Sequence, residues 1–158
     1  MLEPCRAEPA CEAHARFPGT LASLAEIRRF VGAAAARAEL DKEDSYRARL
    51  AVDEIATNVV VYGYGAPGAA GELHLTARSC PSALAVEIED TAAPFDPRAY
   101  PLPTEEDLGR PLAERIEGGL GLLLAARSVD AMDYQRDGDR NRTTLFFRGA
   151  AARPAGER

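Results

Sequence analysis

The chain has 158 residues, of which 46% are hydrophobic, and its formal net charge is −6. This length fits one domain with its own hydrophobic core, and the acidic balance argues against a nucleic-acid partner, because neutralising phosphates requires clustered cations. The chain lacks both the apolar core of a signal peptide and the ~20 apolar residues of a membrane span, so we expect a cytoplasmic protein that binds no membrane.

The first part of the chain predicts a leader, a short strand and a helix. Residues 1–12 show no periodicity and are expected to form a flexible leader, whereas residues 14–17 fit a strand that ends at Pro18-Gly19. Thr20 is a good N-cap for a helix that runs to about Leu40. The apolar residues of this helix recur at helical spacing: Leu21, Leu24, Ile27 and Val31.

A second helix and a hairpin follow. The helix is expected to begin near residues 44–45 and to end at the glycine-rich segment that starts with Gly63. Residues 72–77 and 84–90 each alternate polar and apolar side chains, and the Pro81-Ser82 pair between them indicates a turn. The apolar stripe of the helix consists of Ala48, Ala51, Val52, Ile55, Val59 and Tyr62.

The C-terminal half combines a long irregular segment with a helix and a second hairpin. Five prolines interrupt residues 91–117, which predicts a lid or binding loop, because irregular segments of this length are otherwise uncommon in compact domains. Residues 120–129 fit a helix, and residues 132–147 fit a hairpin that turns at Asp137-Gly138-Asp139. Residues 150–158 have the composition of a flexible tail.

The order of these elements predicts the fold class. Hairpins combined with helices favour an α+β two-layer sandwich, in which helices cover one face of a mixed, mostly antiparallel sheet. No internal repeat divides the chain, and we expect residues 13–149 to form a single domain.

Glu54 and Asn58 are the first candidates for a functional site. They lie four residues apart on the second helix and share one side of it, at the border of the buried face. A carboxylate and an amide oxygen placed in this way can address a Mg²⁺–phosphate cluster, because Mg²⁺ prefers oxygen ligands. The carboxylate can also orient or deprotonate a hydroxyl. An ordinary polar pair at a helix boundary fits the same spacing, which leaves both interpretations open.

Asp90 and a glycine cluster are two further candidates. Asp90 ends a strand whose Val86 and Ile88 point inward, so its carboxylate can accept a hydrogen bond from the amino group of an adenine, or it can simply begin a turn. The segment Gly118-Gly119-Leu120-Gly121 begins a helix, where backbone N–H groups and the helix dipole favour a phosphate. Glycines also end loops without binding anything, so this pattern is weak by itself.

Other residue types supply less evidence. Thr143 and Thr144 lie in the last strand, where threonine is common because of its β propensity. Arg115, Arg140 and Arg142 can reach a phosphate only if the fold brings them to it. The chain has no P-loop or G-x-S-x-G motif, and its three cysteines and two histidines show no zinc or nucleophile spacing. We therefore expect none of the common phosphate-loop, hydrolase or zinc sites.

The order and spacing of three segments resemble the N, G1 and G2 boxes of the GHKL ATPase superfamily, the HATPase_c domain. The segments are Glu54-Ile-Ala-Thr-Asn58, Asp90-Thr-Ala-Ala-Pro-Phe-Asp96 and Gly118-Gly-Leu-Gly121. Within that superfamily the chain is most similar to the anti-sigma-factor serine/threonine kinases, which share its Gly-Leu-Gly-Leu helix and a D-x-x-x-Y strand, here Asp130 to Tyr134. The likeness covers residues 14–149, nearly the whole chain.

The resemblance implies the left-handed ATP-binding sandwich called the Bergerat fold, with ATP and Mg²⁺ as cofactors. Asn58 would ligate Mg²⁺, Glu54 would be the catalytic residue, either as general base or as the carboxylate that orients the hydroxyl, and Asp90 would bind the adenine amino group. Residues 97–117 would be the ATP lid. The other nucleotide contacts that the resemblance implies are Ala92, Phe95, Gly118, Gly119, Leu120, Gly121 and Thr144.

The resemblance also implies a serine/threonine protein kinase that phosphorylates a STAS-type anti-sigma antagonist in a partner-switching pathway. A sigma factor as a second partner and a homodimer are consistent with the same family. One departure leaves an alternative open, because this chain has Ala92 and Pro94 where the G1 box usually carries glycines, and proline fixes φ. The alternative is a nucleotide-gated anti-sigma or protein-binding module with negligible kinase activity. A plain α+β interaction domain would explain each motif singly but not their order.

Overall fold

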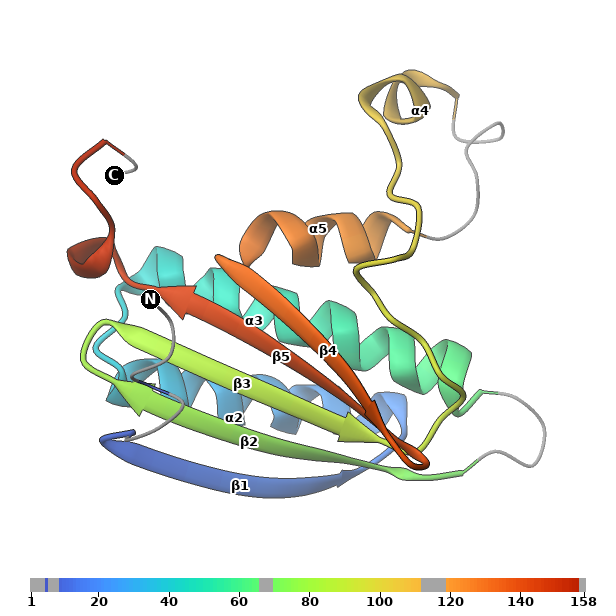
Figure 1. Ribbon diagram of the computed structural model, residues 1–158, viewed down its shortest axis with the longest axis horizontal. Coiled ribbons are helices and arrows are strands. Elements are labelled where there is room, and N and C mark those ends of the chain that lie inside the picture. The colour runs from blue at the N-terminus through green and yellow to red at the C-terminus, as the bar shows by residue number, and fades with distance from the viewer. Residues whose placement is uncertain (1–4, 6–8, 66–69, 112–118, 157–158) are drawn as a thin grey trace.

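The computed structural model describes residue 5 and residues 9–65, 70–111 and 119–156. Five strands form one sheet (Figure 1), and neighbouring strands are antiparallel in the order β1-β2-β3-β5-β4. The prediction was a mixed, mostly antiparallel sheet, whereas all strand pairs among the described residues are antiparallel. The strands are β1 (Cys11–Pro18), β2 (Glu72–Cys80), β3 (Ala83–Asp90), β4 (Ala131–Asp137) and β5 (Arg140–Arg148).

Three helices cover one face of this sheet, which confirms the predicted α+β two-layer sandwich (Figure 1). They are α2 (Leu24–Arg37), α3 (Lys42–Asn58) and α5 (Leu120–Ser128), and α3 packs against both of the others. A 3₁₀ turn (Leu21–Ser23) precedes α2, and a turn of π-helix (Val59–Gly63) continues α3. None of the helices in the described ranges combines the length and apolar composition that crossing a bilayer requires.

The core lies between the sheet and the helices because the strands alternate buried and partly exposed side chains. In β2, for example, Leu73, Leu75 and Ala77 are buried and the residues between them are not. The same alternation at the end of β3 buries Ile88 and Asp90, which brings a carboxylate to the edge of the core. The largest fully buried apolar side chains are Phe147, Ile27, Leu73, Leu75, Leu84, Ile88, Leu145, Val31, Val52 and Val86.

The start of α3 lies earlier than the sequence predicted, at Lys42. Its N-cap is Asp41, whose carboxylate accepts a hydrogen bond from the Asp44 backbone N–H at 2.8 Å. The Asp44 side chain is buried and accepts hydrogen bonds from Arg47 at 2.6 Å and from the Ala150 N–H at 3.0 Å. Several cap-forming residues follow one another here, so the spacing alone could not select the one that caps the helix.

Packed residues extend beyond the predicted domain limits of 13–149. Arg153 donates hydrogen bonds to the Asp44 carboxylate and, at 3.1 Å, to the Arg148 carbonyl oxygen, which attaches the segment after β5 to the domain. That segment begins with a 3₁₀ turn (Ala150–Ala152). At the other end, the side chain of Cys5 is buried, with its Sγ 3.2 Å from the Arg78 carbonyl oxygen. These attachments consist of a few long-range contacts and not of a repeating pattern, so no periodicity in the sequence indicated them.

The segment between β3 and α5 contains a short helix, α4 (Glu105–Gly109), that the sequence reading treated as irregular. Thr104 caps α4 in a capping box: its Oγ1 accepts a hydrogen bond from the Asp107 N–H at 3.2 Å, and Asp107 Oδ2 accepts one from the Thr104 N–H at 2.8 Å. Figure 1 shows α4 standing away from the sheet and the other helices. Residues 112–117 of the predicted lid lie outside the described residues.

Candidate functional site

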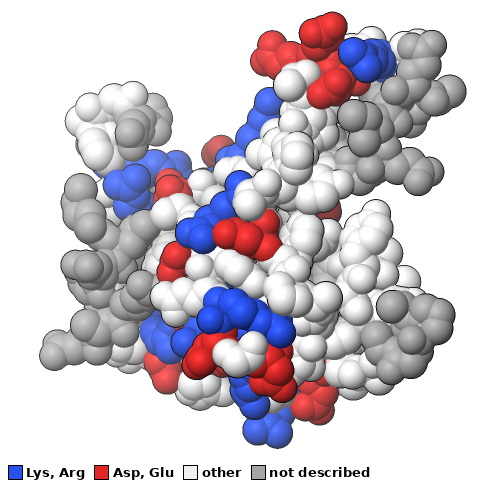
Figure 2. Space-filling view, turned by 45° about the vertical axis from the view of Figure 1, so that its right-hand side comes forward, with Lys and Arg blue, Asp and Glu red and all other residues white. Residues whose placement is uncertain are grey.

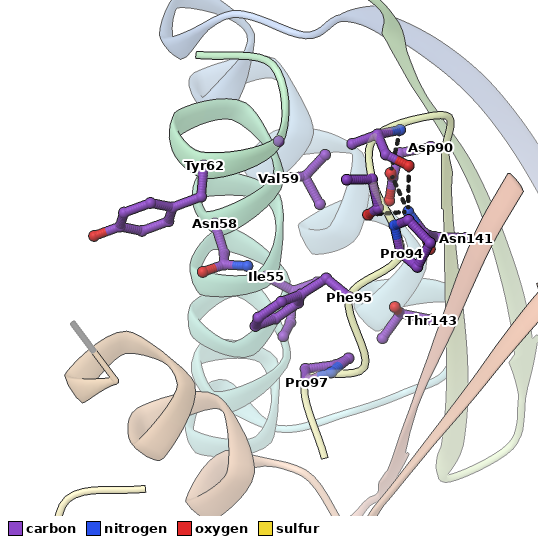
Figure 3. A pocket seen from close by; sticks show the side chains of 13 residues that line it. Ile55, Asn58, Val59, Tyr62, Asp90, Pro94, Phe95, Pro97, Asn141 and Thr143 are labelled. Atoms are coloured by element: carbon purple, nitrogen blue, oxygen red, sulfur yellow. Dashed lines mark hydrogen bonds between the residues drawn. The ribbon is translucent and has the colours of Figure 1, made fainter. Parts of the chain in front are cut away.

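A cavity of about 140 Å³ lies between α3, the loop that follows β3, and the start of β5. Figure 3 shows side chains from these places gathered around it. Its volume is below the roughly 300 Å³ at which pockets for whole drug-sized ligands begin, so it suits a single ring system. Its lining residues are Ile55, Asn58, Val59, Tyr62, Gly63, Asp90, Ala92, Ala93, Pro94, Phe95, Pro97, Asn141 and Thr143.

α3 and the π-turn after it supply one wall of the cavity. Ile55, Asn58, Val59 and Tyr62 follow one another at helical spacing and so share one side of the helix. Asn58, the predicted Mg²⁺ ligand, is half-buried among them (Figure 3). The π-turn is closed by a hydrogen bond of 2.9 Å from the Tyr64 N–H to the Val59 carbonyl oxygen. Such turns often occur at functional sites.

Glu54, the predicted catalytic base, lies one helical turn before Asn58 and faces the first turn of α5. A Cβ added to Gly121 would overlap Glu54 Oε2, so the absence of a side chain at position 121 lets the two helices approach closely here. Burial and, to a lesser extent, the charge of Asp53 raise the pKa of the Glu54 carboxyl above its usual value. A raised pKa makes the carboxylate a better proton acceptor, as a general base requires.

Asp90, the predicted acceptor for an adenine amino group, lies at the end of β3 and is 5% exposed. Its Oδ1 accepts hydrogen bonds from the Ala92 N–H at 2.9 Å and from Asn141 Nδ2 at 2.8 Å. Burial raises the pKa of this carboxyl, against the lowering effect of these two donors and of Arg136. Oδ2 accepts no hydrogen bond from the residues that the structure describes, so it is the oxygen left for a ligand.

The G1 loop, residues 91–97, supplies the opposite wall. Ala92 and Phe95, both predicted as nucleotide contacts, line the cavity. Phe95 and Pro94 are seen on this side of it in Figure 3. A Cβ placed on Gly63 would lie only 2.7 Å from the Ala92 Cβ, which is closer than carbon atoms pack. This chain has alanine at position 92, where the G1 box usually has glycine. Gly63 lies opposite Ala92 and, because it has no side chain, leaves room for the Ala92 methyl group.

Tyr64, which the sequence patterns did not reveal, fastens the G1 loop to the sheet. Its hydroxyl accepts a hydrogen bond from the Thr91 N–H at 2.9 Å and donates one to the Glu72 carbonyl oxygen at 3.0 Å. The ring packs against the backbone at Gly19 and Gly71, where an added Cβ would overlap it. These two glycines, each next to a strand end, were the available signal that a large side chain packs there.

The predicted phosphate-binding glycines lie at the start of α5, and the structure describes two of the three. Gly119 has a φ of +84°, a left-handed conformation that glycine adopts at little cost. Gly121 follows in the first turn of α5, and Leu120 between them is 49% exposed. Gly118 lies outside the described residues, as does Arg115.

The structure corrects the prediction for Thr144. Adjacent residues of a strand point to opposite faces of the sheet, and Thr143 is the threonine that lines the cavity. Thr144 instead pairs with Glu87 and Asp133 on the face away from the helices. Both threonines are buried, so hydrophobic patterning did not distinguish them, and a shift of one residue exchanges the two faces.

Arg140 and Arg142 lie on that same outer face and are paired with acidic residues of β3. Arg142 Nη2 lies 3.5 Å from Glu89 Oε2, and Arg140 Nη1 lies 3.8 Å from the same oxygen. A further pair joins Arg142 Nε to Glu87 Oε1 at 3.7 Å. Figure 2 shows acidic and basic side chains interspersed on the visible face of the molecule. The fold therefore directs these arginines away from the cavity.

The fold and the site together define a GHKL-type ATPase domain of the kind found in anti-sigma-factor kinases. The chain belongs to the histidine kinase-like ATPase domain family, whose model matches residues 17–147. It is similar to the serine/threonine-protein kinase BtrW of Bordetella bronchiseptica, with 33% identity over 101 residues that cover 64% of this chain and 68% of BtrW.

A solved structure shares the fold. It is the crystal structure of the RsbU and RsbW domains of Rv1364c from Mycobacterium tuberculosis, with a TM-score of 0.59 and 18% sequence identity. The match covers 89% of this chain and 33% of the other, so this chain spans about a third of that longer protein.

Proposed function

We propose that this protein is a serine/threonine protein kinase that transfers the γ-phosphoryl group of ATP to a serine of a STAS-type anti-sigma antagonist. The carrying observation is the placement of Glu54 and Asn58 one turn apart on α3, between the Asp90 cavity and the start of α5. Membership of an ATPase family implies ATP binding, and the kinase BtrW is a relative. The STAS-type partner, and a sigma factor as a second partner, come from the resemblance of the sequence motifs.

The adenine base is assigned to the cavity. Asp90 Oδ2 has no partner among the described residues and can accept a hydrogen bond from the amino group of the base, while Ile55, Val59 and Phe95 supply apolar surface around the ring. The phosphates are assigned to the region between Asn58 and the start of α5, because the N–H groups at a helix N-terminus favour anions. The cavity needs to hold only the base, which agrees with its small volume.

Asn58 is the residue assigned to Mg²⁺. Among the described residues no group of three His, Cys, Asp or Glu side chains could hold a metal ion, and the proposal needs only Asn58 as a protein ligand. This fits Mg²⁺, which binds phosphates through one or two protein oxygens and keeps several waters. When bound, the ion neutralises charge on the phosphates.

Glu54 is assigned to the acceptor serine. In the transfer, the serine oxygen bonds to the γ-phosphorus while the bond to the ADP oxygen breaks, and the serine proton passes to the Glu54 carboxylate. The pKa of Glu54, raised chiefly by burial, favours this proton transfer. Most of the rate enhancement comes from positioning the two substrates and stabilising charge.

A second candidate function is a nucleotide-gated anti-sigma or protein-binding module with negligible kinase activity. The observation that favours it is Pro94 in the cavity wall, because proline fixes φ and has no N–H to offer a ligand. ATP would then shape a surface for the partner without being consumed. Cytoplasmic localisation and a homodimer remain predictions under both candidates.

The two candidates are separated by phosphoryl transfer. Purified protein is incubated with γ-labelled ATP, Mg²⁺ and each STAS-domain protein encoded in the same genome, alongside a Ser→Ala variant of each acceptor. The kinase proposal predicts label on one acceptor serine and a rate about 100-fold or more lower for Glu54→Gln, which still binds ATP. Glu43→Gln, an exposed change on the same helix, is the control. ATP-dependent binding of an acceptor without any label supports the second candidate and refutes the first.

A further inference from the structure

Asn141 occupies a position that no motif singled out, directly opposite Asp90. β3 and β5 pair so that Asp90 and Asn141 are register partners, and Asn141 is 3% exposed. Its Nδ2 donates hydrogen bonds to Asp90 Oδ1 at 2.8 Å and to the carbonyl oxygens of Ala92 at 3.1 Å and Ala93 at 3.2 Å (Figure 3). One buried amide therefore holds both the carboxylate and the G1 loop.

The β4–β5 hairpin fixes the orientation of that amide. Asn141 Oδ1 accepts hydrogen bonds from the Tyr134 hydroxyl at 2.6 Å and from Arg136 Nη1 at 3.1 Å. A guanidinium can only donate hydrogen bonds, so the amide oxygen must face Arg136 and the NH₂ group must face Asp90. Arg136 Nη1 also donates to the Ala92 carbonyl oxygen at 3.0 Å, which adds a second attachment for the loop.

These contacts determine which oxygen of Asp90 is available. The Ala92 N–H and Asn141 Nδ2 both donate to Oδ1, at 2.9 Å and 2.8 Å, and together they hold the carboxylate in one orientation. The other oxygen, Oδ2, is left for the ligand. Without Asn141 the carboxylate would lose its side-chain donor and could turn about its terminal torsion, which is broad.

The same contacts explain how the G1 loop keeps its shape without the usual glycines. Ala92 and Ala93 direct their carbonyl oxygens at Asn141, whose amide supplies a hydrogen-bond partner for both. Pro94 fixes the next φ angle, so the loop has little freedom to find other partners. In this chain the loop is held by side chains of the β4–β5 hairpin.

We propose that Asn141 is the positioning residue for base recognition, which orients Asp90 so that Oδ2 meets the amino group of an adenine base. The proposal rests on the assignment of ATP to this cavity. Tyr134 and Arg136 act one step further away, by fixing the Asn141 amide. Asn141 itself contributes no hydrogen bond to the amino group.

The test compares two nucleotides that differ only in that amino group. Affinities of the purified protein for ATP and for purine riboside triphosphate, which lacks the 6-amino group, are measured by calorimetry with Mg²⁺. We expect the wild type to prefer ATP by about ten- to a hundredfold, the range expected for a hydrogen bond to a charged acceptor. Asn141→Ala should reduce this preference to less than about threefold, mainly by weakening ATP binding. Gln135→Ala, an exposed change on the same hairpin, should keep the wild-type preference.

Each outcome bears either on the positioning role of Asn141 or on the proposed ATP site. A wild-type preference retained in folded Asn141→Ala, or an equal loss of affinity for both nucleotides, overturns the positioning role. A wild type that binds neither nucleotide overturns the proposed function instead. If circular dichroism shows that Asn141→Ala does not fold, Tyr134→Phe replaces it, because that change removes only the 2.6 Å hydrogen bond to the amide. This variant should lose part of the preference, and an unchanged preference counts against the proposal.

Discussion

Gly63 and Ala92 provide a quantitative test of how this protein tolerates its altered G1 loop. In Gly63→Ala the new methyl carbon would lie 2.7 Å from the Ala92 Cβ, whereas carbon atoms pack at about 3.5–4.0 Å. The end of the π-turn or the G1 loop must therefore move by about 1 Å. Overpacking of this kind costs about 1–3 kcal/mol of unfolding free energy. At about 2 kcal/mol, the Tm of a domain of this size falls by roughly 4–8 °C.

The double variant isolates the contact. Ala92→Gly alone should cost at most about 1 kcal/mol, because glycine loses more backbone entropy on folding. Gly63→Ala combined with Ala92→Gly removes the overlap, so it should be about as stable as Ala92→Gly alone, with a coupling energy near 2 kcal/mol. Urea denaturation followed by circular dichroism measures all four proteins. Gly109→Ala, where an added Cβ meets nothing within 4 Å, is the matched control.

Two results would refute this reasoning. The first is a Gly63→Ala variant within about 0.5 kcal/mol of the wild type, which would mean that the two positions do not touch. The second is strict additivity in the double variant, which would assign the cost to the glycine itself rather than to Ala92. The expected coupling would show that Gly63 is what accommodates an alanine in the G1 box.

Two further predictions concern the same site. Tyr64→Phe removes the hydroxyl that hydrogen-bonds to Thr91 and Glu72, so it should lower the free energy of unfolding by about 1–3 kcal/mol in urea denaturation. Tyr46→Phe, at an exposed position, is the control and should leave the stability unchanged. Equal stabilities of the two variants would contradict the attachment of the G1 loop by Tyr64. Burial raises the pKa of Asp90 in the folded state above its value in the unfolded chain. The protonated Asp90 side chain therefore contributes to stability at a pH below the unfolded-state pKa, and this contribution is lost as the pH rises through the folded-state pKa. The free energy of unfolding of Asp90→Asn minus that of the wild type should therefore be larger at pH 7 than at about pH 3.5. A difference that does not change with pH would argue against the raised pKa.

The sequence predicted the secondary structure well where patterns are local. The alternation of polar and apolar side chains identified residues 72–77 and 84–90 as a hairpin, and the structure extends these strands to β2 and β3. The helical stripe likewise identified α3, although not its N-cap at Asp41. The missed helix α4 is five residues long, too short to produce a periodic pattern.

Several of the candidate residues that the resemblance implies lie around one cavity, but the resemblance does not give the register of the strands. Asn58 on α3 comes together around one cavity with Asp90, Ala92 and Phe95, although these two segments are distant in the sequence. The choice of Thr144 was wrong because only the pairing of β5 with β3 shows which threonine faces inward.

The residues that sequence reasoning missed act across long separations in the chain. Asn141 reaches Asp90 only because two strands pair in a particular register, and Tyr64 reaches Thr91 across 27 positions. Neither residue belongs to a motif that local spacing can define. The available signals were indirect: the paired glycines at positions 19 and 71 around the Tyr64 ring, and the register that the hairpin turn sets for β5.

The central claim, that Asn58 and Asp90 belong to one Mg²⁺-dependent ATP site, is tested most directly by calorimetric titration of the purified protein with ATP, with and without Mg²⁺. The account predicts one-to-one binding that requires Mg²⁺ in the wild type, and loss of that Mg²⁺ dependence together with most of the affinity in Asn58→Ala, whose circular dichroism spectrum and Tm stay unchanged. No binding to a folded wild type, or an unaltered affinity in Asn58→Ala, would contradict it.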